Sequence, residues 1–396
     1  MKKLTLFSLF LAAVVIILGA YTRLTDAGLG CPDWPGCYGN LTVPLSADKV
    51  NAANAAYPER PVEAFKAWNE MIHRYFAGTL GLCIAAIAFI AFRQRKQGTP
   101  FKLPLLLLGL VTFQAALGMW TVTLNLLPVV VMGHLLGGFS VLSCLFLLYL
   151  RLREADTGAN SVSQSSVSKS TVSKSLVSQE PVSKDSAEQV ASPSVAGLSR
   201  MKTFALFGVG VLVIQIALGG WTSANYAALA CTDMPVCEEG WQSRLDFAGA
   251  FSVPEAENYE FGAHDYGERA TMHIVHRAGA LITFSYLLAL GLTLFFKQGA
   301  SLQLKRVSAI MIGCLFAQVA LGVSNVVFAL PLAVAVLHNA FAAILLLSLL
   351  WIVFSLIKHT SAAPTYDSLV NAARHTTLSS HALPQALSKA TGGLHG

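Results

Sequence analysis

Eight apolar stretches run through this chain, and each is long enough to cross a lipid bilayer as a helix. A spanning helix needs about 20 mostly apolar residues, at a rise of about 1.5 Å per residue. Hydrophobic residues make up 54% of the 396 residues and charged residues only 12%, too little charge to cover a soluble protein of this length. We therefore expect an all-α membrane protein with eight transmembrane helices, near residues 4–22, 70–92, 104–124, 128–150, 203–222, 271–296, 306–328 and 331–357.

Four of these stretches end in variants of one phrase, which indicates an internal duplication. The phrase closes the first, third, fifth and seventh stretches, as VIILGAYT at 15–22, QAALGMWT at 114–121, QIALGGWT at 215–222 and QVALGVSN at 318–325. Histidines recur at matching places in the two halves. We expect a pseudo-symmetric pair of bundles, an N-terminal one in residues 1–150 and a C-terminal one in residues 203–358.

Two polar segments complete the expected domain organisation. Residues 151–202 contain a five-residue repeat that begins VSQSS-VSKST and holds too little apolar mass to form a core. We expect this segment to be a disordered cytoplasmic linker between the bundles. Residues 359–396 are expected to form a polar cytoplasmic tail.

The basic residues predict how the helices are oriented. Most of the 27 Lys and Arg residues lie on the side that holds the N-terminus, so the positive-inside rule places both termini in the cytoplasm. The first stretch follows Lys2 and Lys3 as in a signal peptide, but its end, LGAYTRL, lacks a small-x-small cleavage site, and we expect it to stay as a helix. The net charge of +6 follows from this topology and predicts no nucleic-acid partner.

Two pairs of histidines lie near the outer ends of apolar helices. His73 in EMIHR matches His276 in HIVHR, and His134 matches His338. In each half the two histidines lie within about two helical turns of the outer surface, so they can meet at one depth. Two imidazoles without carboxylate or thiolate neighbours make a poor zinc site, but they can supply both axial ligands of a haem iron. We therefore expect two haem sites.

Glycines and cysteines add to the predicted sites. Small residues near the histidines either let a flat macrocycle approach the backbone or allow close helix packing, and the two uses are compatible: Gly78, Gly81, Gly137, Gly138 and Gly279. Each half also has a C-x5-C motif after its first helix, formed by Cys31 and Cys37 and by Cys231 and Cys237. On the outer face, with a proline between the cysteines, two local disulfides are the leading interpretation, and a metal site is the alternative.

Taken together, these motifs resemble the haem A synthase family, in its bacterial form with paired extracellular cysteines. The resemblance rests on GAYTRLTDAGLGCPDWPGC at 19–37, EMIHR at 70–74, HIVHR at 273–277, the second cysteine pair, His134 and His338. It implies eight helices in two four-helix bundles. It also implies an oxidoreductase that converts haem O to haem A by oxidising a porphyrin methyl group to a formyl group.

The resemblance assigns different roles to the two sites. It implies that His276 and His338 are the axial ligands of a haem b cofactor, and that His73 and His134 bind the haem O substrate. It places the chain in a bacterial inner membrane as a multi-pass protein, in contact with lipid. A haem O synthase and oxidase-assembly factors are the implied partners, whereas the electron-transfer partner and the source of the formyl oxygen are not identified.

Glu70 is the position at which the two halves differ. It lies three residues before His73, where the second half has His273 three residues before His276. An ionisable group in a membrane helix is costly unless it serves a function, and the resemblance to the family favours a Glu70 that acts chemically on the substrate haem. The alternative is a helix N-terminal residue that interacts with the macrodipole. The roles of His264 and His273 stay open.

Three arginines are candidates for contacts with haem propionates. Arg74 and Arg277 directly follow predicted ligands, and Arg23 lies in the TRLT segment. Each is predicted either to pair with a propionate or to anchor its helix at the membrane interface. Two other classes of protein share parts of this pattern: a dihaem electron-transfer protein linked to quinol, and a repeat-built transporter without haem.

Overall fold

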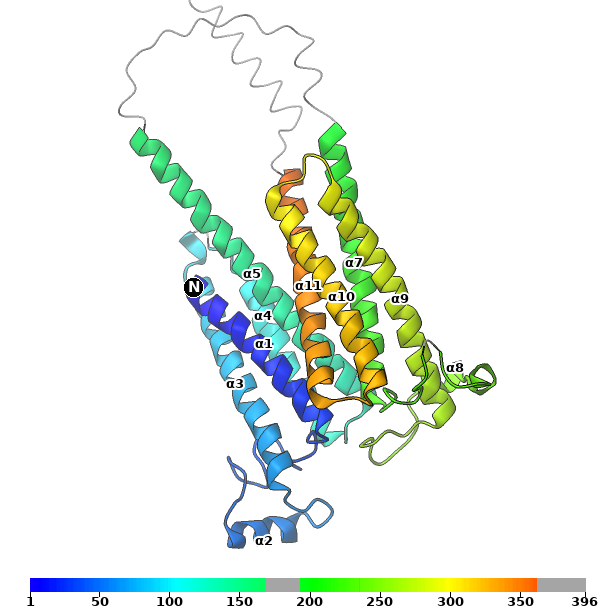
Figure 1. Cartoon of the computed structure of the whole chain (residues 1–396). Helices are drawn as coiled ribbons and strands as arrows, with labels where there is room; N and C mark the ends of the chain where they lie inside the picture. The colour runs from blue at the N-terminus through cyan, green and yellow to red at the C-terminus, as the bar shows by residue number, and fades with distance from the viewer. Residues whose placement is uncertain (98, 169–192, 235, 362–396) are drawn as a thin grey trace, which may run out of the picture. The chain divides into compact units, whose positions relative to one another are not determined.

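The computed structural model describes residues 1–97, 99–168, 193–234 and 236–361. Within these residues the regular structure is helical, with no strand longer than an isolated bridge between Cys37 and Asn40. The helices are α1 (Lys2–Leu24), α2 (Ala47–Ala56), α3 (Ala64–Arg93), α4 (Lys102–Thr123), α5 (Pro128–Ser168), α7 (Pro193–Ala224), α8 (Phe247–Ala250), α9 (Tyr266–Phe296), α10 (Leu302–Val327) and α11 (Leu332–Ser361), with 3-10 turns at Arg95–Gln97 and Trp241–Arg244 (Figure 1).

Eight of these helices are long and apolar enough to cross a membrane, which confirms the predicted number of spans. They are α1, α3, α4, α5, α7, α9, α10 and α11. Large apolar side chains such as Phe10, 69% exposed, and Leu82, 75% exposed, point away from the protein. Apolar exposure of this kind along eight long apolar helices is typical of a surface that meets lipid. The chain is therefore a multi-pass membrane protein.

Several helix ends lie outside the ranges expected from hydropathy. α3 begins at Ala64, six residues before the expected start near residue 70, and the polar helix α2 precedes it. α5 continues to Ser168 and α7 begins at Pro193, so parts of the expected linker 151–202 are helical. Residues 169–192 and the tail 362–396 lie outside the described residues. The expected division into domains stays a prediction.

The chain divides into two compact units that do not follow the repeat. One unit comprises Met1–Glu180 and Thr203–Phe354 and contains all or most of each of the eight spans. The other comprises Pro181–Lys202 and Ser355–Gly396. Within the first unit, α1 and α4 both pack against α3 and α5. α9 packs against α10, and Phe207 of α7 contacts Tyr286 of α9 with ring centroids 5.3 Å apart.

Matching helices end in the same backbone conformation. Asp26 and Tyr226, just after α1 and α7, have φ values of 49° and 53°. The turns after α4 and α10 each contain two residues with positive φ, Asn125 and Leu126 after α4, and Ala329 and Leu330 after α10. These left-handed residues close the helices without glycine, a conformation that is uncommon for other residues. The internal repeat therefore extends from the sequence to the backbone.

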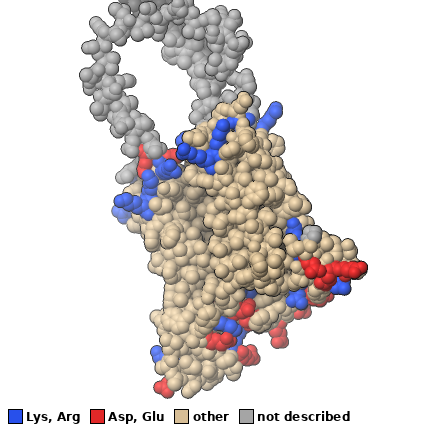
Figure 2. Space-filling model, in the orientation of Figure 1, with Lys and Arg blue, Asp and Glu red and all other residues tan. Residues whose placement is uncertain are grey.

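Charged side chains lie at the ends of the helices. In Figure 2, Asp and Glu gather at the end that carries α2 and α8, and Lys and Arg gather at the opposite end. The middle of this face carries almost no charge, as expected for a surface that meets hydrocarbon. This separation is the pattern on which the predicted orientation depends.

Candidate functional site

The first histidine pair joins α3 to α5. The ring centroids of His73 and His134 are 6.5 Å apart, and the ring planes are inclined at 77°. If one metal ion binds two imidazoles from opposite sides at about 2 Å from each nitrogen, the ring centroids lie about 6 Å apart. The buried Nδ1 atoms of both rings make no hydrogen bond of normal geometry within the described residues. The structure thus brings together the two predicted ligands of the N-terminal half at a separation that suits a haem iron.

The second pair consists of His276 on α9 and His338 on α11, and a glutamine side-chain amide lies beside each ring. Gln215 Nε2 lies 3.0 Å from His276 Nδ1 and donates to the His276 carbonyl oxygen at 3.1 Å. Gln318 Nε2 lies 3.3 Å from His338 Nε2. In each C-terminal ring one nitrogen therefore has a glutamine amide beside it.

Every one of the four histidine rings lies against a glycine of the repeated phrase. A Cβ atom built at Gly19 would lie 3.0 Å from Cε1 of His73, and Gly219 stands in the same relation to His276 at 3.0 Å. The corresponding distances are 3.1 Å for Gly118 with His134 and for Gly322 with His338. These contacts are tighter than ordinary van der Waals contacts, so the glycine is what allows each imidazole to reach the neighbouring helix. The recurring glycine of each phrase is thereby explained.

Spacing along the chain does not mark these four glycines as site residues, although the phrase that contains them is the clearest repeat in the sequence. Of the glycines that spacing singles out, Gly78 and Gly81 have open space where a Cβ would be. Gly137 and Gly279 serve a different purpose, because a Cβ there would overlap the Oε1 atoms of Gln114 and Gln215. Each of these two glycines makes room for a glutamine that hydrogen-bonds a histidine on the same helix.

Glu70 is buried, with only 4% of its surface exposed, and both of its oxygens accept hydrogen bonds. Arg74 Nη2 donates to Oε1 at 2.5 Å, and the backbone N–H of Cys31 donates to Oε2 at 2.8 Å. Because α3 begins at Ala64, Glu70 lies well beyond the first turn of the helix. The interpretation of Glu70 as a helix-end residue is therefore wrong. The carboxylate instead joins α3 to the loop above it.

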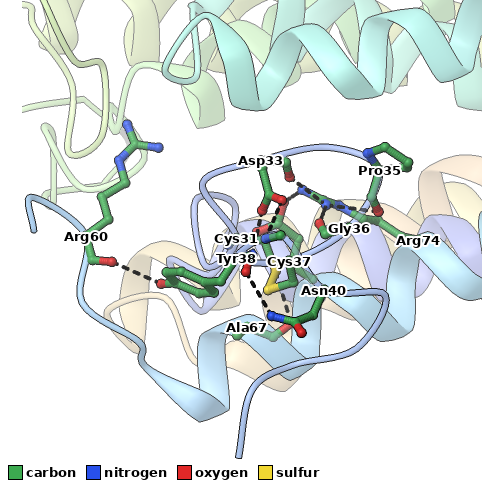
Figure 3. The surroundings of a disulfide bond; sticks show 12 residues. Cys31, Asp33, Pro35, Gly36, Cys37, Tyr38, Asn40, Arg60, Ala67 and Arg74 are labelled. Atoms are coloured by element: carbon green, nitrogen blue, oxygen red, sulfur yellow. Dashed lines mark hydrogen bonds and ion pairs between the residues drawn. A yellow bond between two sulfur atoms is a disulfide. The ribbon is translucent and has the colours of Figure 1, made fainter. Parts of the chain in front are cut away.

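Both cysteine pairs form disulfides, as predicted, and each closes a short loop: Cys31–Cys37 and Cys231–Cys237. An arginine fastens each loop to the helix below it. Arg74 Nη1 donates to the carbonyl oxygens of Asp33 at 2.9 Å and Gly36 at 2.5 Å, as the dashed lines in Figure 3 show. In the second half, Arg277 donates to the carbonyl oxygens of Cys231 at 2.6 Å and Asp233 at 2.8 Å.

The third arginine, Arg23, connects the two halves of the chain. Its Nη2 donates to the carbonyl oxygen of Ser223 at 2.8 Å, and its guanidinium lies over the ring of Tyr226, 4.0 Å from the centroid. Tyr226 in turn donates to Asp26 Oδ1 at 3.0 Å. All three candidate propionate ligands thus already have protein partners, and contact with a propionate stays a prediction.

The two histidines left without a role lie in the second half. His273 stands where the first half has Glu70 and is buried at 4% exposure, with no hydrogen bond of normal geometry to its Nδ1 in the described part of the chain. His264 Nδ1 lies 2.8 Å from Glu268 Oε2, at the start of α9. Beside its histidine, the first half therefore has the buried carboxylate of Glu70, paired with Arg74, where the second half has the imidazole of His273.

These features define a class, that of multi-pass membrane proteins with an internal repeat, a pair of histidines in each half and a disulfide-closed loop in each half. Comparison with known proteins gives the family. The family model of cytochrome oxidase assembly proteins (COX15-CtaA) matches residues 2–350, and the chain belongs to this family.

Individual relatives are similar over most of the chain. The chain is 46% identical to the haem A synthase of Shewanella oneidensis over 357 residues, which cover 90% of this chain and 96% of that protein. It is 26% identical to the haem A synthase of Caulobacter sp. strain K31 over 363 residues, 85% of this chain and 92% of the relative. A third haem A synthase, from Sinorhizobium fredii, is 25% identical over 364 residues, 86% of this chain and 84% of that protein.

Proposed function

We propose that this protein is a haem A synthase, an oxidoreductase that converts a methyl group of haem O to the formyl group of haem A. Family membership and the relative that is 46% identical support this function. The observation that carries it is an asymmetry. Two repeated bis-histidine sites differ in that only the first has a buried carboxylate, Glu70, three residues before its histidine.

The division of labour follows from this asymmetry. His73 and His134 would bind the haem substrate in the N-terminal half, and His276 and His338 would hold a resident haem b in the C-terminal half. The ring separation in the first pair and the four glycine contacts fit an iron–porphyrin between two helices. When bound, the haem supplies the redox chemistry, and the protein supplies ligands, orientation and protons.

Glu70 would manage protons at the substrate. Its carboxylate is held in one orientation by Arg74 and by the N–H of Cys31, so a proton acceptor stands at a fixed place on the histidine-bearing face of α3. Proton transfer by a positioned carboxyl group contributes about 10²–10⁴-fold to rate in enzymes. The disulfide-closed loop would cover this end of the site and exclude water from it.

The proposed setting is the inner membrane of a bacterium, with both termini in the cytoplasm. The disulfides would then lie on the oxidising outer face, which is where such bonds persist. Haem O synthase and oxidase-assembly factors would be the neighbouring proteins, because a membrane-bound product this apolar needs direct transfer at both ends of the reaction.

Pigment analysis tests the function directly. The full chain, expressed with a haem O supply and purified in detergent, should yield haem A or a hydroxylated haem O on acid–acetone extraction, together with haem b. Extraction of haem b alone would instead favour the dihaem electron-transfer protein. A preparation without haem absorption bands would contradict both haem proteins and favour a transporter without haem.

A further inference from the structure

The outer loop of the C-terminal half reaches across to the N-terminal half. Its residues 257–261, here called the crossing segment, meet the turn that follows α4. The backbone N–H of Tyr259 donates to the carbonyl oxygen of Asn125 at 3.0 Å, and Asn125 Nδ2 donates to the carbonyl oxygen of Glu257 at 2.8 Å. Asn125 Oδ1 also accepts a hydrogen bond from Arg60 Nη2 at 2.6 Å. One asparagine therefore joins the outer segments of both halves.

Tyr259 of the crossing segment belongs to a small apolar cluster on the N-terminal half. Its other buried members are Leu29 and Leu126, and Val131 of α5 packs against them. Val131 lies three residues before His134, so the cluster lies about one helical turn from the first histidine site. Leu29 lies in the loop that leads from α1 to the first disulfide. The crossing segment therefore helps to bury part of the outer loop of the other half.

The matching residues of the C-terminal half are exposed. Leu29 and Leu229 each lie two residues before the first cysteine of a pair, and Leu29 is 8% exposed whereas Leu229 is 38% exposed. The turns after α4 and α10 also match, and there Asn125 and Ala329 have φ values of 49° and 52°. Ala329 is exposed and has no polar side-chain atom that could bind a crossing segment. The covered leucine is thus the one in the half that contains Glu70.

Three successive residues connect this cover to Glu70. Leu29 packs in the apolar cluster. Gly30 lies so close to α3 that an added Cβ would be 2.6 Å from the carbonyl oxygen of Lys66. Cys31 donates its N–H to Glu70 Oε2 at 2.8 Å, in a buried contact. A loop that is held at Leu29 and Gly30 presents the Cys31 N–H at a fixed place, and this hydrogen bond fixes one oxygen of the carboxylate.

We propose that the crossing segment positions Glu70 through the Cys31 N–H, and that Asn125 and Tyr259 are the positioning residues that hold the segment in place. The half that binds the cofactor would thereby complete the substrate site of the other half. This inference rests on the proposed function, since it takes Glu70 as the group that manages protons at the substrate. A misplacement of about 1 Å at a reacting group can cost about 100-fold in rate. Loss of the cover should therefore slow the reaction and leave the resident haem in place.

Hydrogen exchange of the outer loop measures this positioning without haem or turnover. Full-length protein in detergent is exchanged in deuterated buffer, quenched, reduced and digested, and deuterium uptake is followed in the peptide that contains Cys31. Asn125→Ala and Tyr259→Ala should each speed exchange in this peptide by about fivefold or more. The peptide that contains Cys231 should exchange as before. Ala329→Asn, the matched control in the turn after α10, should alter neither peptide.

Pigment extraction from the same variants measures the consequence for the reaction. Asn125→Ala and Tyr259→Ala should retain haem b and accumulate haem O or a hydroxylated intermediate, with haem A reduced by about tenfold or more. Tyr259→Phe keeps the ring and loses only the hydrogen bond that the hydroxyl group donates to the Pro254 carbonyl oxygen at 2.8 Å. It should therefore restore both slow exchange and haem A. This rescue separates the contact of the ring with Leu29 from general damage to the fold.

Unchanged exchange around Cys31 in both Asn125→Ala and Tyr259→Ala would overturn the inference, and so would faster exchange with undiminished haem A. If Tyr259→Ala cannot be purified, Asn125→Ala decides alone, because Ala329 shows that alanine is accommodated in this turn. The proposed function fails on a different result. If the unaltered protein makes no haem A, the reaction is wrong, whereas the exchange experiment still decides whether the crossing segment holds the loop.

Discussion

Each of the four histidine rings rests against a glycine at which an added methyl group would lie only 3.0–3.1 Å from the ring, closer than an ordinary van der Waals contact. Hydropathy and spacing single out the four histidines, but among the glycines they point to Gly78 and Gly81 on the helix of His73 itself. The glycine in contact with His73 is Gly19, on the neighbouring helix α1. Spacing along one helix reveals which residues share a face, whereas the residue that faces them across a helix contact depends on packing.

A methyl group at one of these glycines should therefore weaken haem binding in one half only. Gly219→Ala places a Cβ 3.0 Å from His276 Cε1. Overpacking of this kind costs about 1–3 kcal/mol, and we expect the variant to fold but to lose most of its haem b, measured as pyridine haemochrome per protein. Gly78→Ala is the control, because nothing lies within 4 Å of its added carbon. Equal haem content in both variants would contradict this role for Gly219.

Glu70 can be tested by a change that keeps its size. Glu70→Gln retains a hydrogen-bond acceptor for the Cys31 N–H but removes the group that can exchange a proton. We expect the variant to keep haem b and to accumulate haem O or a hydroxylated intermediate, with haem A formation reduced by about 100-fold or more. Glu63→Gln, an exposed carboxyl just before the same helix, is the control. Near-normal haem A from Glu70→Gln would leave Glu70 with only the structural task of holding the loop.

At the scale of helices, the sequence predicts the eight spans well because lipid demands long apolar runs. It predicts the outer segments poorly. α2 is a polar ten-residue helix, and the first turns of α3, with Ala67 and Met71 buried, pack beneath the Cys31–Cys37 loop. These turns are stabilised by contacts with a distant part of the chain and not by hydropathy, so no local pattern marks the start of α3 at Ala64.

The two pairs of helices that carry histidines should have separable roles. Replacing His276 or His338 with alanine should remove haem b and lower the yield of folded protein, because a bound ligand stabilises the native state. Replacing His73 or His134 should leave haem b in place and stop haem A formation. Pigment extraction from all four variants measures both effects. A uniform fall in haem b across the four would refute the separation.

At the scale of the whole molecule, charge is divided between the two ends of the helices, acidic where α2 and α8 lie and basic at the other. An excess of Lys and Arg in the short connections between spans sets the orientation in which a chain is inserted into the membrane. It could be read from the sequence without any structure, because it depends only on which connections carry Lys and Arg. The disulfides at the acidic end agree with that assignment.

A labelling experiment tests the orientation. Ser46 lies beside α2 and Gln94 beside the opposite end of α3, and both are exposed. A membrane-impermeant maleimide added to intact spheroplasts should label Ser46→Cys and should label Gln94→Cys only after lysis. The unaltered chain serves as the control, since four of its seven cysteines are paired in disulfides and the other three lie within spans. The reverse labelling pattern would invert the predicted topology.

The glycine contacts also limit how this chain can change in length. If one residue is inserted in α1 before Gly19, the glycine can stay opposite His73, but the part of the helix before the insertion rotates by about 100°. If the residue is inserted after Gly19, the glycine rotates by the same angle relative to the loop that follows α1. The same holds for α4, α7 and α10. The segment 41–63 contains no glycine, so no contact of this kind limits its length. Lengthening a flexible loop twofold costs only about 0.6 kcal/mol. Insertions and deletions among relatives should therefore fall between the helices. In α1, α4, α7 and α10, the number of residues from the glycine to the turn at the outer end of the helix should stay constant.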